Sequence, residues 1–171
     1  MRVVMVVLAV VSAPFAVIAK QPPETKVFLE TRYRSIESLR ELPPELAAAF
    51  RKHVHGAPVA DRGEAFRATD VVLSGDPPPR RFLAAGTSPS GSFVAYEHGG
   101  RGHHYHLVLF GAEAPEPHRL ATCTGMNLDL PRSRGRLDGK KQALFDRLIQ
   151  QHIARDLRAG ACEATDAEFD F

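Results

Sequence analysis

Four of the eight histidines in this 171-residue chain fall within nine residues, at positions 98 to 106. Tyr96, Glu97 and Tyr105 lie in this stretch or directly before it, so imidazoles, phenols and a carboxylate are close together in sequence. Imidazole is a ligand for Zn, Cu and Ni, and its proton titrates near pH 6.5 when unperturbed. The segment therefore predicts metal binding or proton exchange if the fold gathers these side chains on one face.

The run Gly99-Gly100-Arg101-Gly102 predicts the turn of a β-hairpin that joins strands at 92–98 and 103–110. Because side chains alternate faces along a strand, a turn of two or four residues puts Glu97, His104 and His106 together. Two imidazoles and a carboxylate could bind zinc or another divalent transition metal and leave a position open for water. A three-residue turn would exchange the faces of the second strand.

Two further interpretations of the hairpin stay open. The histidines and tyrosines could simply make cross-strand contacts and hydrogen bonds at a solvent-exposed end of the hairpin. The tip could also form a binding surface for an envelope or secreted protein, as in an inhibitor that inserts a rigid loop into a cleft. The residues of this surface would be Tyr96, His98, Arg101, His103 and Tyr105. A phosphate-binding loop is not expected, because such a loop joins a strand to a helix.

No catalytic residue is predicted. Ser88-Pro89-Ser90-Gly91 does not match the G-x-S-x-G nucleophile elbow, and Asp76 is better explained as the start of a turn before three prolines. We therefore expect a non-enzymatic binding or inhibitor-like protein of the cell envelope without a cofactor. The alternative is a metal-binding protein or metal-dependent hydrolase that uses Glu97, His104 and His106. A small enzyme whose site is assembled from distant residues is a third hypothesis.

Residues 1–19 have the layout of a secretory signal peptide, with Arg2 ahead of an apolar stretch and Val17 and Ala19 before the expected cleavage point. We expect a soluble protein in the periplasm or outside the cell, with no stable membrane span after cleavage. The remaining 152 residues carry 21 basic and 20 acidic side chains, a formal charge of +1. So small and scattered an excess predicts no nucleic-acid partner. In an oxidising compartment, Cys123 and Cys162 are expected to form a disulfide.

The elements that must position these residues are predicted from periodicity and turn signals. Helices are expected at 44–53 and 139–158, and strands at 66–73, 80–87, 92–98, 103–110 and 118–123. The predicted fold is α+β, with an antiparallel meander of four to five strands that packs an N-terminal and a long C-terminal helix on one face. We expect an extended mature N-terminus at 20–34, a single domain at 35–162 and a loose acidic tail at 163–171.

Overall fold

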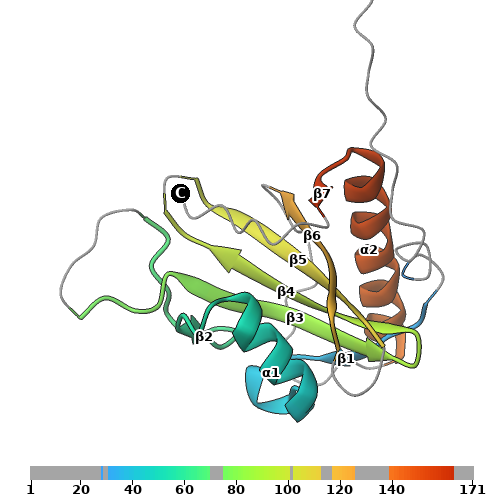
Figure 1. Cartoon of the computed structure of the whole chain (residues 1–171), viewed down its shortest axis with the longest axis horizontal. Helices are drawn as coiled ribbons and strands as arrows, with labels where there is room; N and C mark the ends of the chain where they lie inside the picture. The colour runs from blue at the N-terminus through green and yellow to red at the C-terminus, as the bar shows by residue number, and fades with distance from the viewer. Residues whose placement is uncertain are drawn as a thin grey trace, which may run out of the picture.

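A computed structural model describes Phe28 and residues 31–69, 75–100, 102–112, 117–125 and 139–163 (Figure 1). These residues form a seven-stranded sheet with an α-helix from each end of the chain, so the predicted α+β class is confirmed. The expected signal peptide at 1–19 and the tail after Glu163 lie outside the described residues, and both stay predictions. Neither described helix carries an apolar stretch long enough to cross a membrane.

Four long strands form an antiparallel meander in sequence order: β3 (Arg80–Ser88), β4 (Gly91–His98), β5 (His104–Gly111) and β6 (Arg119–Gly125). Each overlaps a predicted strand, because tight turns and alternating or continuous apolar residues are local signals. The strand predicted at 66–73 is not present in residues 66–69, and residues 70–73 lie outside the described part.

Three short strands complete the sheet and make it wider than predicted. β1 (Arg34–Ile36) and β2 (Val59–Ala60) pair with opposite ends of β3, β1 antiparallel and β2 parallel. β7 (Cys162–Glu163) pairs with β6. Strands of two or three residues are too short to show a periodicity in the sequence, and they form because the edges of β3 and β6 offer unpaired backbone groups.

The two helices cover opposite faces of the sheet. α1 (Pro44–His53) buries Leu46 and Phe50 in a core that contains Val94 and Val108. α2 (Gly139–Arg158) buries Ile149 and Ile153 in a second core on the other face. The expectation that both helices pack on one face is therefore wrong. Residues 93–96 and 107–110 are all buried, so the central strands are apolar on both faces of the sheet. Each face therefore needs a layer of other residues packed on it.

Segments before and after the meander are attached to it by packing and by a disulfide. Phe28 and Tyr33 are buried in the core under α2, so the packed part of the chain extends to the N-terminal side of residue 35. A 3-10 turn, η2 (Leu39–Glu41), leads into α1. Cys123 of β6 and Cys162 of β7 form the predicted disulfide, with an S–S distance of 2.09 Å. Because β7 follows α2 closely, this bond fixes the end of the helix to the sheet.

Candidate metal centre

The register of the β4–β5 hairpin decides which side chains share a face. His98 pairs with His104, and Tyr96 pairs with His106. Five residues, 99–103, separate the first of these pairs, and an odd number exchanges the faces of the second strand relative to an even turn. Glu97 therefore lies opposite Tyr105, on the other face from His104 and His106. The predicted ligand set of Glu97, His104 and His106 is not assembled, and His98 takes the place of Glu97.

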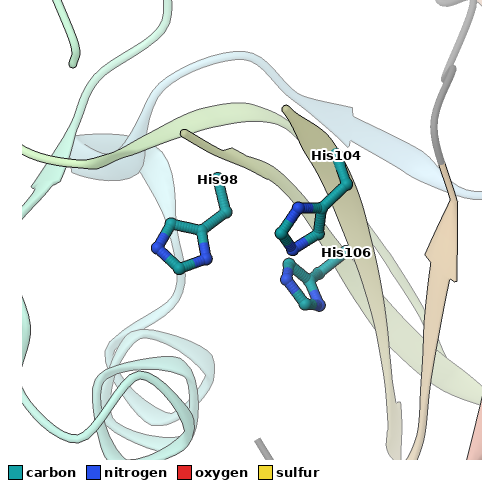
Figure 2. Close-up of side chains that lie close together, drawn as sticks. All are labelled: His98, His104 and His106. Atoms are coloured by element: carbon teal, nitrogen blue, oxygen red, sulfur yellow. The ribbon is translucent and has the colours of Figure 1, made fainter. Parts of the chain in front are cut away.

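His98, His104 and His106 come together at the turn end of this hairpin (Figure 2). One ring nitrogen from each lies within 4.8 Å of those of the other two. The ring centroids are 5.4 Å apart for His98 and His104, 6.1 Å for His98 and His106, and 4.7 Å for His104 and His106. His106 is buried, whereas His98 and His104 are partly exposed. We refer to these three residues as the histidine cluster.

Neighbouring strands supply the flanks of the histidine cluster. Residues that pair across strands point to the same face, so each row of the sheet can be followed from strand to strand. Arg80 of β3 pairs with His98, in the row that also contains His104. In the next row whose side chains point to this face, His106 of β5 pairs with Thr124 of β6. The cluster therefore lies between an arginine on one side and a threonine on the other.

The last turn of helix α1 lies on the same face of the sheet and reaches the cluster through Tyr96. Tyr96 is fully buried, and its ring stacks on the His106 ring with centroids 4.8 Å apart and planes 16° apart. The Tyr96 hydroxyl lies 3.2 Å from Nε2 of His53, which belongs to the last turn of α1. A fourth imidazole is thus linked to the cluster through Tyr96.

Two hydrogen bonds orient the rings of His104 and His106. Nδ1 of His104 bonds the backbone carbonyl of Gly102. Because a carbonyl oxygen only accepts, Nδ1 carries the hydrogen and the Nε2 lone pair of a neutral His104 is left for another partner. Nδ1 of His106 lies 3.3 Å from the Thr124 hydroxyl. Metal-binding histidines are commonly held in this way, with the second ring nitrogen bonded to the protein.

The surroundings of His106 keep its ring neutral. Burial lowers its pKa to about 3, helped by the charges of His104, His98, His53 and Arg80. The neutral imidazole is the form that binds a metal ion, so His106 would not have to lose a proton to bind one near neutral pH.

The separation of the nitrogens is close to what a small cation requires. Three nitrogens bound to tetrahedral zinc at about 2.0–2.1 Å lie about 3.3 Å from one another. The cluster, with nitrogens within 4.8 Å, would close by about 1–1.5 Å around such an ion. His98 and His104 lie at strand ends and are partly exposed, and this closure would require their rings to rotate.

Glu97 and His103 belong to a separate ion-pair group on the opposite face. Glu97 is only 6% exposed, and its carboxylate accepts a hydrogen bond from Nε of Arg81 at 2.6 Å. Its other oxygen lies 2.6 Å from Nε2 of His103, which is exposed. Phe66 packs under this pair, with the Arg81 guanidinium 4.2 Å from the centre of its ring. Glu97 is therefore already engaged by Arg81 and His103.

The residues expected to form a binding surface at the tip do not share one surface. Tyr96 is buried beneath α1, whereas Tyr105 is buried beneath α2. The Tyr105 hydroxyl donates to Oδ2 of Asp156 at 2.7 Å, and burial followed by this hydrogen bond raises the pKa of Tyr105 above its ordinary value. His98 joins the histidine cluster, and His103 is exposed on the other face. Arg101 lies outside the described residues.

His53, Arg80 and Thr124 were not predicted as site residues. They come from α1, β3 and β6, and only the pairing of strands and the docking of α1 bring them to the hairpin. The one available signal was the position of Arg80 at the start of a predicted strand in which Phe82 and Leu83 are both apolar.

The sequence matches no protein-family model, and no curated protein and no solved structure is significantly similar to it. The function must therefore be inferred from the chemistry of the site itself.

Proposed function

We propose that this protein binds one divalent transition-metal ion through His98, His104 and His106. The observation that carries the proposal is the convergence of three ring nitrogens within 4.8 Å at the end of one hairpin. The hydrogen bond from His104 to the Gly102 carbonyl supports it, because this bond leaves Nε2 of His104 for the ion.

The ligand chemistry favours zinc, copper or nickel. Imidazole nitrogen suits these ions, whereas Mg²⁺ and Ca²⁺ prefer oxygen ligands. Thiolate ligation is excluded, because both cysteines of the chain form the disulfide. Three histidines leave a fourth position for water, which is the arrangement of catalytic zinc sites. A hydrolase in which the metal activates this water is the enzymatic form of the same proposal.

The proposed cellular location is the periplasm or the exterior. The apolar leader at 1–19 supports export, and a disulfide is the expected state of a cysteine pair in an oxidising compartment. Recognition of an envelope protein by the hairpin tip also stays a prediction. Of the residues named for it, His103 has an exposed side chain.

Metal titration of the protein purified without a histidine tag and stripped with a chelator tests the proposal. Calorimetry with Zn²⁺, Cu²⁺ and Ni²⁺ should give one equivalent with a Kd of about 1 µM or tighter for at least one ion. Loss of an outer-shell partner costs about 10–100-fold in metal affinity, so His104→Ala should cost at least about 100-fold.

His103→Ala is the matched control, because it removes an imidazole from the same hairpin but from the opposite face. It should bind metal as the wild type does, and so should Glu97→Gln if that variant folds. Equal loss of affinity in the His103 and His104 variants would overturn the assigned ligand set. Absence of binding by the wild type below about 1 mM would overturn metal binding altogether.

A further inference from the structure

Helix α2 carries a row of basic side chains on its outer face. Lys140, Arg147 and Arg158 are separated by 7 and 11 residues, which is close to two and three full turns at 3.6 residues per turn. They therefore project from one side of the helix, and all three are exposed. The side that packs on the sheet is marked by Ile149 and Ile153, and Arg147 lies about 200° around the axis from Ile149. We refer to Lys140, Arg147 and Arg158 as the basic row.

The basic row keeps its positive charge. Among the described residues, no carboxylate lies within ion-pair distance of any member of the row. Arg158 donates from Nε to the Ala154 carbonyl of its own helix at 2.9 Å, and this bond leaves the charge in place. Arg155 is not counted in the row, because its guanidinium is bonded to Asp156 at 2.8 Å. Three charges without a described counter-charge therefore extend over about 27 Å of helix, at a rise of about 1.5 Å per residue.

Helix stability does not explain the cation at the start of the row. Lys140 lies in the first turn of α2, which contains no acidic residue. The unpaired N–H groups of a first turn carry partial positive charge, so a basic side chain there is unfavourable and an acidic one is favoured. Arg158, in the last turn, suits the helix dipole, whereas Lys140 opposes it. A negatively charged partner outside the helix would offset this unfavourable contribution.

An exposed leucine accompanies the basic row. Leu144 follows Lys140 by four residues, one turn further along nearly the same side of α2. It is 38% exposed, and no other large apolar side chain in the described part of the chain is exposed. Basic side chains with an apolar one beside them are typical of helices that lie at the interface between lipid headgroups and acyl chains. The leucine therefore indicates lipid rather than nucleic acid, whose backbone is contacted mainly through charge.

The position of α2 allows an extended surface to reach the basic row. α2 packs on one face of the sheet and α1 on the other, so the two helices lie on opposite sides of the molecule (Figure 1). The histidine cluster is on the α1 side, because Tyr96, which stacks on His106, belongs to the core under α1. A surface that contacts the basic row would therefore leave the histidine cluster on the opposite side.

We propose that the outer face of α2 docks the protein on an anionic lipid bilayer, with the basic row at the headgroups and Leu144 inserted among them. The inference goes beyond the proposed metal binding and does not depend on it. Each basic residue near an anionic membrane contributes about fivefold to binding, so three residues give about 100-fold. Such binding is reversible and weakens with salt, because the screening length is about 10 Å at 0.1 M salt.

Sedimentation with vesicles tests the proposal. The wild type should bind vesicles of phosphatidylcholine that contain phosphatidylglycerol, and it should be released at about 1 M salt, where the screening length falls to about 3 Å. The double variant Lys140→Gln with Arg147→Gln should bind these vesicles about 25-fold more weakly. Leu144→Gln should bind them several-fold more weakly and should show the same salt dependence as the wild type.

The matched control is the double variant Arg51→Gln with Lys52→Gln. It removes the same number of charges from exposed positions in the last turn of α1, on the other side of the molecule, and it should bind as the wild type does. All variants share residues 1–19, so binding through this apolar leader would be equal in all of them and would also appear with pure phosphatidylcholine.

Four results would contradict the proposal. Equal weakening by the two double variants would show that net charge, rather than the basic row, determines binding. A wild type that does not distinguish vesicles with and without phosphatidylglycerol would overturn docking on an anionic bilayer. Wild-type affinity in Leu144→Gln would overturn the insertion of the leucine. Tight binding of duplex DNA without binding of vesicles would assign the basic row to nucleic acid instead of lipid.

Discussion

Asp61 bonds the start of the segment that contains α1 to its end, and its replacement by asparagine should loosen that segment. Asp61 directly follows β2, and its carboxylate accepts hydrogen bonds from the Ser38 hydroxyl and from the backbone N–H of Leu39 at 2.9 Å. It also accepts from the backbone N–H of Arg62 at 2.7 Å. Residues 38 and 61 flank α1, so this contact joins the two ends of the segment 38–61, which contains α1 and His53.

The cost of Asp61→Asn can be worked from these contacts. The amide side chain would keep one carbonyl oxygen for the backbone donors but would lose the negative charge and the second acceptor. Hydrogen bonds to charged groups contribute about 1.5–3 kcal/mol, and a neutral replacement keeps part of that, so we expect the substitution to cost about 1–2 kcal/mol at pH 7. For a domain of this size, that corresponds to about 3–6 °C in Tm.

The pH dependence gives the prediction its specific signature. Partial burial by itself would raise the pKa of Asp61, but the hydrogen bonds from Ser38, Leu39 and Arg62, with the charge of Arg40, outweigh it and lower the pKa below the ordinary value. A carboxyl group whose pKa is lowered on folding stabilises the protein above its unfolded pKa of about 3.9. This contribution is lost as the pH falls through the folded pKa.

Urea unfolding followed by circular dichroism at pH 7, 5, 4 and 3 measures the effect. The difference in unfolding free energy between wild type and Asp61→Asn should be full at pH 7 and 5 and should shrink below pH 4. Titration of other groups cancels, because both proteins contain them. A difference that stays constant down to pH 3, or that is absent at pH 7, would refute the assignment of the stabilisation to the ionised carboxylate.

Two further changes test the scaffold around the site. Replacing Cys123 and Cys162 together by serine removes a link that spans 39 residues and should cost about 3–4 kcal/mol, read from the urea midpoint of oxidised wild type and variant; equal midpoints would contradict this. A Cβ at Gly99 would lie 1.9 Å from the Arg67 carbonyl oxygen, whereas one at Gly102 meets no atom within 4 Å. Gly99→Ala should therefore cost about 1–3 kcal/mol and Gly102→Ala almost nothing, and similar losses in thermal melts of both variants would contradict the close packing of the turn.

Much of the scaffold could be predicted from the sequence because its signals are local. The bounds of both helices, Pro44–His53 and Gly139–Arg158, agree with the predicted ones, since a proline at the first helical turn and a 3.6-residue apolar period mark them directly. The four long strands and the disulfide were also predicted. The face covered by each helix was not, because apolar residues on both sides of a strand do not say which helix covers which side.

The sequence by itself determined that imidazoles concentrate in one hairpin, because residue type and spacing are read directly from the chain. Only the tertiary structure decided which of them meet. Side chains alternate along a strand, so five residues rather than four between the paired positions replace Glu97 by His98 among the neighbours of His104 and His106. Arg80 and Thr124 join from other strands because hydrogen bonding between strands, which acts across long stretches of sequence, sets the rows of the sheet.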